Sequence, residues 1–361
     1  MGLVEELRQK LLLKKPEPSP EPKREDFLST GLTLLNLAIT GHPDWGLRRG
    51  EFYLLVGDSQ AGKTWLMHQI AAELASNSAF DEYSIVFDQP ERGAKMDVAR
   101  YFGQRLADRI QEPTKAGSSR TLDEHYDNVS EWVRKRPTFY ALDSEDSLSA
   151  EADLKKIAKD RNARKKIKAG SEQEVAGSYA MAKPKLNSGR LRVAHNELLD
   201  TGSIYLMVKQ TRDNVGPGAM FNPKTRSGGR ALTFYTGVEL WFSVRGKLNR
   251  TVMGKKRVIG STLRIHVKKN RETGRDRMVE VPFYPSHGLD DVGSMVDFLI
   301  EEERWKETKG RIVAPELDFE GPYEKLVQAA EGKLKTLKRC VVGLWNDIED
   351  GCAVKRQRRY Q

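Results

Sequence analysis

The sequence predicts an α/β fold in which a central, mostly parallel, twisted sheet is flanked by helices. From Asp26 onward, short apolar segments typical of strands alternate with segments whose apolar residues recur at helical spacing. One strand leads into a glycine-rich turn that opens an amphipathic helix, a unit typical of open α/β sheets. The expected strands span residues 51–56, 84–87, 138–142, 203–208, 238–244, 261–267 and 278–284.

A chain of 361 residues is expected to hold one large core with smaller elements at its ends. Residues 1–25 combine a short amphipathic helix at 4–13 with a proline-rich linker. Residues 26–290 form the expected core, with helices at 65–76 and through 101–132. Residues 291–361 are expected to form a small helical region, with helices at 292–305 and 323–345 and a basic tail.

The composition favours a polyanionic partner over a metal or a membrane. The net charge is +10, and the lysines and arginines gather in a few stretches, although a generally basic soluble protein would also fit. The two cysteines form no CxxC pair and have no nearby histidine cluster, which excludes a disulfide framework or zinc site of the usual spacing. No apolar run could span a bilayer, so we expect a cytoplasmic protein without a membrane partner.

The strongest motif is GxxxxGKT between an apolar strand and an amphipathic helix, which is the context that a phosphate-binding P-loop requires. The two glycines let backbone N–H groups face inward, Lys63 reaches the outer phosphates, and Thr64 ligates Mg²⁺. We therefore expect ATP and Mg²⁺ as cofactors. The candidate nucleotide-binding residues are Gly57, Asp58, Ser59, Gln60, Ala61, Gly62, Lys63 and Thr64.

Two carboxylates at strand ends are candidates for the rest of the chemistry. Asp143 follows the strand 138–142 and is the expected partner of Thr64 at the metal, although Asp-Ser is also a common helix or turn cap. Glu91 follows the strand 84–87 and is the expected catalytic base. Asp88 and Gln89 compete with it because the turn at Pro90 makes the register uncertain, and Glu91 could also be a surface-turn residue.

Residues 202–242 carry a second, longer pattern. The chain reads Lys-Gln-Thr-Arg at 209–212, Met-Phe-Asn-Pro at 220–223 and Gly-Gly-Arg-Ala-Leu-Thr-Phe-Tyr at 228–235. This pattern strongly resembles the RecA family of recombinases, in which a strand ends in Asn-Gln-x-Arg, a mobile DNA-binding loop follows, and Gly-Gly-x-Ala-Leu-x-Phe-Tyr begins a helix. The resemblance extends to residues 29–31, 34–36, 142–144 and 267–271, and covers most of residues 27–300.

The resemblance implies roles for several residues. It places the family's catalytic glutamate on Glu91 and makes Gln210 the sensor of the third phosphate, although a lone glutamine at a strand end usually only satisfies hydrogen bonds. The expected catalytic residues are thus Glu91, Lys63 and Gln210. Lys269 and Arg271 match positions that reach the nucleotide of the adjacent subunit in a filament, although they could form a solvated basic strand edge.

The resemblance also implies a DNA-binding surface over residues 211–230. There Arg212, Lys224, Arg226 and Arg230 could meet phosphates, while Met220 and Phe221 could wedge between bases, although the last two could instead be a buried apolar pair. A second candidate is the stretch 154–168, which holds eight Lys and Arg residues, including Lys165 and Lys166. It is far more basic than the usual family loop and could also be a solvated helical insertion.

We therefore expect a DNA-dependent ATPase that forms a homo-oligomeric filament on single-stranded DNA and promotes homologous pairing and strand exchange with duplex DNA. The divergent termini favour a bacteriophage-encoded member. A hexameric DNA helicase of RecA fold and a non-catalytic RecA-like DNA-binding accessory protein are the alternatives.

Overall fold

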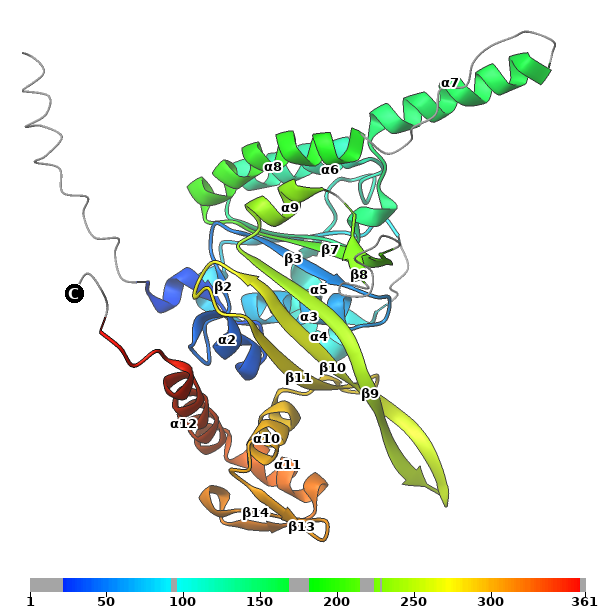
Figure 1. Ribbon diagram of the computed structural model, residues 1–361. Helices are drawn as coiled ribbons and strands as arrows, with labels where there is room; N and C mark the ends of the chain where they lie inside the picture. The colour runs from blue at the N-terminus through cyan, green and yellow to red at the C-terminus, as the bar shows by residue number, and fades with distance from the viewer. Residues whose placement is uncertain (1–21, 92–95, 169–181, 215–223, 228, 358–361) are drawn as a thin grey trace, which may run out of the picture.

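The computed structural model describes residues 22–91, 96–168, 182–214, 224–227 and 229–357. Its main feature is a ten-stranded sheet with the order β12-β11-β10-β9-β3-β7-β6-β4-β5, in which β8 pairs with β7. The expected α/β class is confirmed (Figure 1). The strands are β3 (Phe52–Gly57), β4 (Ser84–Asp88), β5 (Ile110–Gln111), β6 (Thr138–Leu142), β7 (Ile204–Asp213), β8 (Lys224–Arg226), β9 (Val238–Val252), β10 (Lys255–Asn270), β11 (Arg277–Tyr284) and β12 (Gly288–Leu289).

The sheet has a parallel half and an antiparallel half. Strands β9, β3, β7, β6, β4 and β5 pair in parallel, whereas β9, β10, β11 and β12 pair antiparallel. The parallel strands β3, β4 and β6 are buried along their whole length, which explains why they read as continuous apolar runs. A small sheet of β1 (Phe27–Leu28) and β2 (Leu47–Arg48) precedes them.

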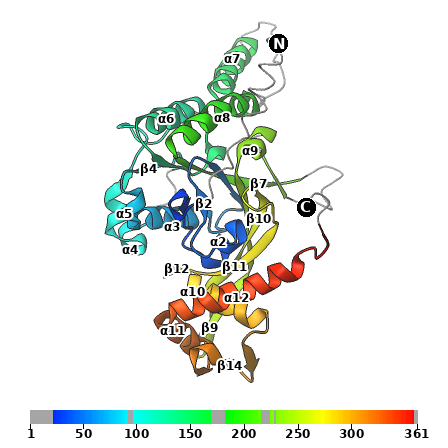
Figure 2. The same ribbon diagram turned by 90° about the vertical axis from the view of Figure 1, so that its left-hand side faces the viewer.

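Helices cover both faces of the sheet and divide the core in two. Along β3, Tyr53 and Leu55 belong to one apolar cluster, and Phe52, Leu54 and Val56 to the other, as the alternation of a strand requires. The first face carries α2 (Thr33–Thr40), α3 (Lys63–Ser76), α4 (Val98–Phe102) and α5 (Gln104–Arg109), and the second carries α6 (Leu122–Lys135), α8 (Ala182–Thr201) and α9 (Arg230–Tyr235) (Figures 1 and 2).

Two expected elements differ in the structure, and the basic stretch takes one of the two forms expected for it. The helical stretch through 101–132 is broken at Gly103, whose φ of 89° does not continue a helix, and further by β5. The basic stretch 154–168 lies in a helix, α7 (Glu151–Lys168), that extends away from the core (Figure 1). Strand β9 runs well past residue 244, and β10 starts well before residue 261. Together they form a long hairpin that projects from the sheet.

The C-terminal region holds strands as well as the expected helices. Helices α10 (Asp291–Glu301), α11 (Tyr323–Gly332) and α12 (Leu334–Cys352) are joined by a three-stranded sheet of β13 (Lys306–Thr308), β14 (Arg311–Ala314) and β15 (Phe319–Gly321). These strands are three or four residues long, too short for a periodic pattern. The single helix expected at 323–345 is two helices that meet at Lys333.

Several expectations fall partly or wholly outside the described residues. The N-terminal helix at 4–13 lies outside them, as do Met220, Phe221 and the end of the basic tail. Among the helices that the structure does describe, none is long and apolar enough to cross a membrane. The division of the chain at residues 25 and 290 stays a prediction.

Candidate nucleotide-binding site

The P-loop connects β3 to α3 through a turn that contains two left-handed residues. Gln60 has a φ of 61° and Gly62, which caps α3, has a φ of 91°. A Cβ atom on Gly62 would lie 2.4 Å from Leu263 Cδ1 of β10, so both the backbone and the packing require glycine there. The loop therefore places the backbone N–H groups at the start of α3 where a phosphate would bind.

The ammonium group of Lys63 lies inside this loop. Its Nζ donates to the carbonyl oxygens of Gly57 at 2.8 Å and Asp58 at 2.6 Å, and the side chain is almost fully buried. Burial lowers the pKa of Lys63, while the carboxylates of Asp143 and Asp58 oppose this shift. A cation held inside a ring of inward-facing N–H groups is suited to the outer phosphates of a nucleotide.

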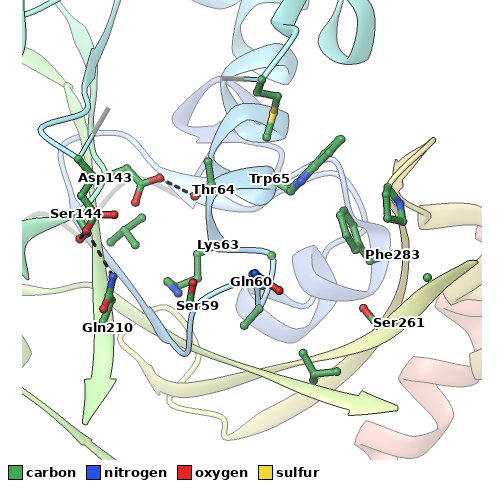
Figure 3. Close-up of a pocket in the computed structure, with 18 of the residues that line it drawn as sticks. Ser59, Gln60, Lys63, Thr64, Trp65, Asp143, Ser144, Gln210, Ser261 and Phe283 are labelled. Carbon is green, nitrogen blue, oxygen red and sulfur yellow. Dashed lines mark hydrogen bonds between the residues drawn. The ribbon is translucent and has the colours of Figure 1, made fainter. Parts of the chain in front are cut away.

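Thr64 and Asp143 meet as the sequence predicts. The Thr64 hydroxyl donates to Asp143 Oδ2 at 2.6 Å, which joins the first turn of α3 to the end of β6 (Figure 3). Burial raises the pKa of Asp143, and the hydroxyl of Thr64 opposes the shift. A hydroxyl and a carboxylate at this distance are oxygen ligands of the kind that Mg²⁺ takes together with phosphates and water. Among the described residues there is no cluster of three or more acidic, histidine or cysteine side chains that could hold a metal alone.

Glu91 lies beyond the end of β4 and faces Ser144, the residue after Asp143. Its Oε1 accepts hydrogen bonds from Ser144 Oγ at 2.5 Å and from Gln210 Nε2 at 3.4 Å. The rival candidate Asp88 is fully buried and bound to His125 Nδ1 at 2.8 Å, so it has no route to a ligand in the cavity. Gln89 and Glu91 both line the cavity, and the assignment of the base to Glu91 stays a prediction.

These residues surround one cavity of about 780 Å³. The P-loop, Asp143 and Gln210 form one side, and the aromatic rings of Trp65 and Phe283 meet edge to face at 5.2 Å on another (Figure 3). The base of the β9–β10 hairpin closes the cavity with residues that the sequence analysis did not single out, namely Val244, Lys247, Val258, Ile259, Gly260 and Ser261.

Gln210 is placed next to the P-loop by strand register. It pairs with Gly57 across β7 and β3, at the point where β7 leaves the buried part of the sheet. The next residue, Thr211, donates a hydrogen bond to the Asp58 carboxylate, and Lys224 of β8 lies 3.4 Å from the same Asp58 oxygen. The β7–β8 hairpin is thus in direct contact with the P-loop.

Lys269 and Arg271 lie outside the lining of this cavity. Lys269 Nζ donates to the carbonyl oxygens at the end of α9, including Thr236 O at 2.7 Å, and Arg271 donates to Phe234 O. Burial, together with the Arg271 charge, lowers the pKa of Lys269 to about 8. Within one chain both residues therefore cap α9 instead of reaching the chain's own nucleotide site.

Comparison with known proteins agrees with this geometry. A family model described as the RecA N-terminal domain matches residues 138–290. The chain is 24% identical over 278 residues to Protein RecA of Gluconobacter oxydans, covering 76% of this chain and 71% of that protein. It is 26% identical to the RecA proteins of Ectopseudomonas oleovorans, covering 76% and 70% of the two chains, and of Clostridium botulinum, covering 77% and 69%. The chain is thus similar to RecA proteins over about three quarters of its length.

This similarity supports, in general terms, a RecA-like recombinase with ATP and DNA binding and a part in DNA recombination and repair. The individual roles of Lys63, Glu91, Asp143 and Gln210 stay predictions. The structure brings all four to one cavity wall, from four different elements of the parallel half of the sheet.

The expected DNA-binding residues are placed less uniformly. The side chains of Arg212 and Lys224 are 64% and 45% exposed, and Arg230 is exposed at the start of α9. Arg226 differs, because its side chain is only 8% exposed and pairs with Glu239 at 3.0 Å. Met220 and Phe221 lie outside the described residues, and of Lys165 and Lys166 only their place in α7 is described.

Proposed function

We propose that this protein is an ATP-dependent recombinase that polymerises on single-stranded DNA with MgATP and promotes homologous pairing and strand exchange with duplex DNA. The observation that carries the proposal is the position of Gln210. Its side chain lies 3.4 Å from Glu91, and its backbone continues as β7 through Thr211 to Asp213, where β7 pairs with β8. Loss of the third phosphate from the cavity would therefore change the position of the segment expected to bind DNA.

In this proposal each cavity residue has one task. Lys63 and the P-loop N–H groups bind the phosphates, and Thr64 and Asp143 hold Mg²⁺, which would neutralise phosphate charge when bound. Glu91 takes a proton from, or orients, the attacking water, and the Ser144 hydroxyl fixes its carboxylate at 2.5 Å. Gln210 responds to the third phosphate.

The same proposal gives Lys269 and Arg271 a role between subunits. Both side chains are cationic donors at the carboxyl end of β10. Both donate to backbone carbonyls at the end of α9, the helix that follows the expected DNA-binding segment. In a filament they would exchange these carbonyls for the phosphates of a neighbouring subunit, so that assembly and ATP hydrolysis are coupled.

The exposed cations Arg212, Lys224 and Arg230 would bind the DNA backbone. Because such contacts release counterions, single-strand affinity should fall steeply as salt rises. Arg226 would contribute only after leaving Glu239, so we expect Arg226→Ala to weaken DNA binding less than Arg212→Ala does.

The deciding experiment is a strand-exchange assay with single-stranded DNA, homologous duplex and MgATP. Joint molecules and exchanged product are expected with ATP and are not expected with ADP or with a heterologous duplex. Electron microscopy under the same conditions should show helical filaments. Closed six-membered rings that unwind duplex DNA would favour the helicase, and DNA binding without ATP turnover would favour the accessory protein.

A further inference from the structure

A group of buried charges lies beneath the end of β7, outside the lining of the nucleotide cavity. Lys209 and Glu145 are both fully buried and in contact, and Lys209 Nζ also donates to Asp146 Oδ1 at 2.9 Å. A third donation goes to Ser227 Oγ at 2.8 Å. The three hydrogens of the ammonium group are therefore all used.

The charges of this group are balanced. Glu145 Oε2 lies 3.1 Å from a second ammonium, that of Lys183, and Glu145 Oε1 accepts from Asn187 Nδ2 at 3.1 Å. Two buried or nearly buried ammonium groups thus face two carboxylates, and the exposed guanidinium of Arg212 lies 3.8 Å from Asp146 Oδ1 at the rim of the group. Removal of any one of these charges would leave the buried group with an unbalanced charge, which is unfavourable.

The members of this group lie at the ends of both segments expected to bind DNA. Glu145 and Asp146 form the short turn between Asp143 and α7, and Lys183 stands in the first turn of α8, where the chain returns to the core. Lys209 is the last buried residue of β7, and Ser227 follows β8. One cluster of buried charges therefore connects the ends of the two segments expected to bind DNA, residues 154–168 and 211–230.

Asp146 connects this cluster to Gln210. Its Oδ1 accepts from Lys209 and from Ser227 Oγ at 2.9 Å, and its Oδ2 accepts from the backbone N–H of Gln210 at 2.8 Å. Burial raises the pKa of Asp146, but the Lys209 ammonium and the Gln210 N–H outweigh it, so the net pKa is below its usual value. The carboxylate is charged at neutral pH and uses both oxygens.

We propose that Asp146 and Lys209 are positioning residues, which hold the Gln210 backbone so that its side chain faces Glu91 and which fix both DNA-binding segments to the same point. The inference rests on the proposed function, because it assigns Asp146 and Lys209 to the coupling between nucleotide and DNA. Neither residue lines the nucleotide cavity. Their loss should therefore remove the effect of the bound nucleotide on DNA affinity, while nucleotide and DNA each still bind.

The test uses Asp146→Asn, because an amide can accept at only one of its two polar atoms. Either Gln210 or the Lys209 side of the cluster then loses its acceptor. Glu151→Gln is the matched control, since it removes one carboxylate from the next turn of chain, where Glu151 pairs with Lys155 on an exposed surface. A second variant, Lys209→Met with Glu145→Gln, removes one charge of each sign together.

The first measurement is hydrogen–deuterium exchange of the full chain without ligands. Asp146→Asn should speed exchange in peptides covering both 143–150 and 204–213, whereas Glu151→Gln should change neither. Faster exchange in only one of the two regions would contradict a common base for the segments. Thermal unfolding monitored by circular dichroism separates this local effect from a general loss of structure.

The second measurement is the ratio of single-strand dissociation constants with ADP and with a non-hydrolysable ATP analogue. We expect a wild-type ratio of roughly tenfold or more, typical of coupling between two sites, and a ratio near one for Asp146→Asn and for the double variant. In a Gln210→Ala background, Asp146→Asn should have no further effect. A retained ratio would overturn this inference alone, whereas a wild-type ratio near one would overturn the proposed function and this inference with it.

Discussion

The two halves of the central sheet contribute to the candidate site in different ways. In the parallel half, β3, β4 and β6 are short buried strands, and β7 is buried up to Lys209. The carboxyl ends of their buried parts carry the P-loop, Glu91, Asp143 and Gln210. In the antiparallel half, β9 and β10 reach the cavity with side chains from within the strands, then continue as an exposed hairpin. The candidate catalytic residues therefore lie at the ends of parallel strands, whereas residues within β9 and β10 form the opposite wall of the cavity.

The physical reason lies in the backbone. Parallel strands end at one edge of a sheet, where loops and helix N-termini leave N–H groups free for a ligand. Antiparallel strands satisfy their backbone groups with one another and offer only side chains. Substitutions on the parallel side should therefore remove a function, whereas substitutions on the antiparallel side and beyond it should change fit or stability.

The largest effect is expected for Lys63→Ala. It removes a buried cation from the phosphate loop, and we expect nucleotide affinity to fall roughly 10³-fold, equivalent to about 4 kcal/mol. Lys247→Ala is the control, because Lys247 lines the same cavity from the hairpin and should change affinity only a few-fold. Titration calorimetry with an ATP analogue measures both variants, and equal losses would contradict the division between the halves.

Glu91→Gln should separate binding from turnover. The amide keeps the size of the side chain but cannot act as a base, so DNA-stimulated ATP hydrolysis should fall by about 10²- to 10⁴-fold. Nucleotide affinity should stay within a few-fold of wild type. A coupled phosphate-release assay compares it with Glu112→Gln, an exposed glutamate on the same side of the sheet. Unchanged turnover in Glu91→Gln would remove Glu91 from the mechanism.

A stability effect is expected at Asp297 in α10, next to the antiparallel half. Burial raises the pKa of Asp297 to about 6, from an ordinary value of 3.8. The folded state thus holds a proton more tightly than the unfolded state, and this stabilisation is complete below about pH 4 and lost as the pH rises through 6. Asp297→Asn avoids the loss, so the variant should be more stable than wild type by about 3 kcal/mol at pH 8.

Thermal unfolding at several pH values tests this expectation. The difference between Asp297→Asn and wild type should shrink as the pH falls from 8 toward 4, and nucleotide affinity should not change. A variant that is less stable than wild type at pH 8 would show that Asp297 is stabilised by its partners in the ionised form.

The smallest effect is expected for Arg250→Ala. Arg250 of the hairpin pairs with Glu324 of α11 at 2.8 Å, but the two side chains are 54% and 69% exposed. An exposed ion pair of this kind contributes about 0.5 kcal/mol. Chemical denaturation should show little change, and Glu324→Ala should behave in the same way. A loss well above 1 kcal/mol would mean that the hairpin is held firmly by the C-terminal region.

The sequence predicts the buried strands better than the exposed ones, in both halves of the sheet. The strand 138–142 has the bounds of β6, and the strand expected at 84–87 is one residue shorter than β4, because buried strands between turns leave a clear apolar run. The outer part of the hairpin is missed because its residues alternate without a core to pack against. The strands β13 to β15 are missed because they are too short.

The same contrast applies to the candidate site. The P-loop and the carboxylates at strand ends can be placed because strand order and register bring them to one edge. Asp146 carries no such signal, since nothing in the sequence shows that residue 146 lies beside residues 209 and 227. Trp65 and Phe283 meet only through packing of α3 against β11, and the exposure of Arg226 depends on Glu239.

The contact between Gly62 and Leu263 has a consequence for how this chain could diverge. Leu263 is a fully buried residue of β10 whose methyl group fills the space that a side chain at position 62 would need. A larger residue in the loop would require a smaller one in the strand, and the positive φ would still penalise it. Natural variants of this protein should therefore keep glycine at position 62 even where Leu263 of β10 is replaced by a smaller residue. A strand of the antiparallel half thus restricts which residues the nucleotide loop can accept.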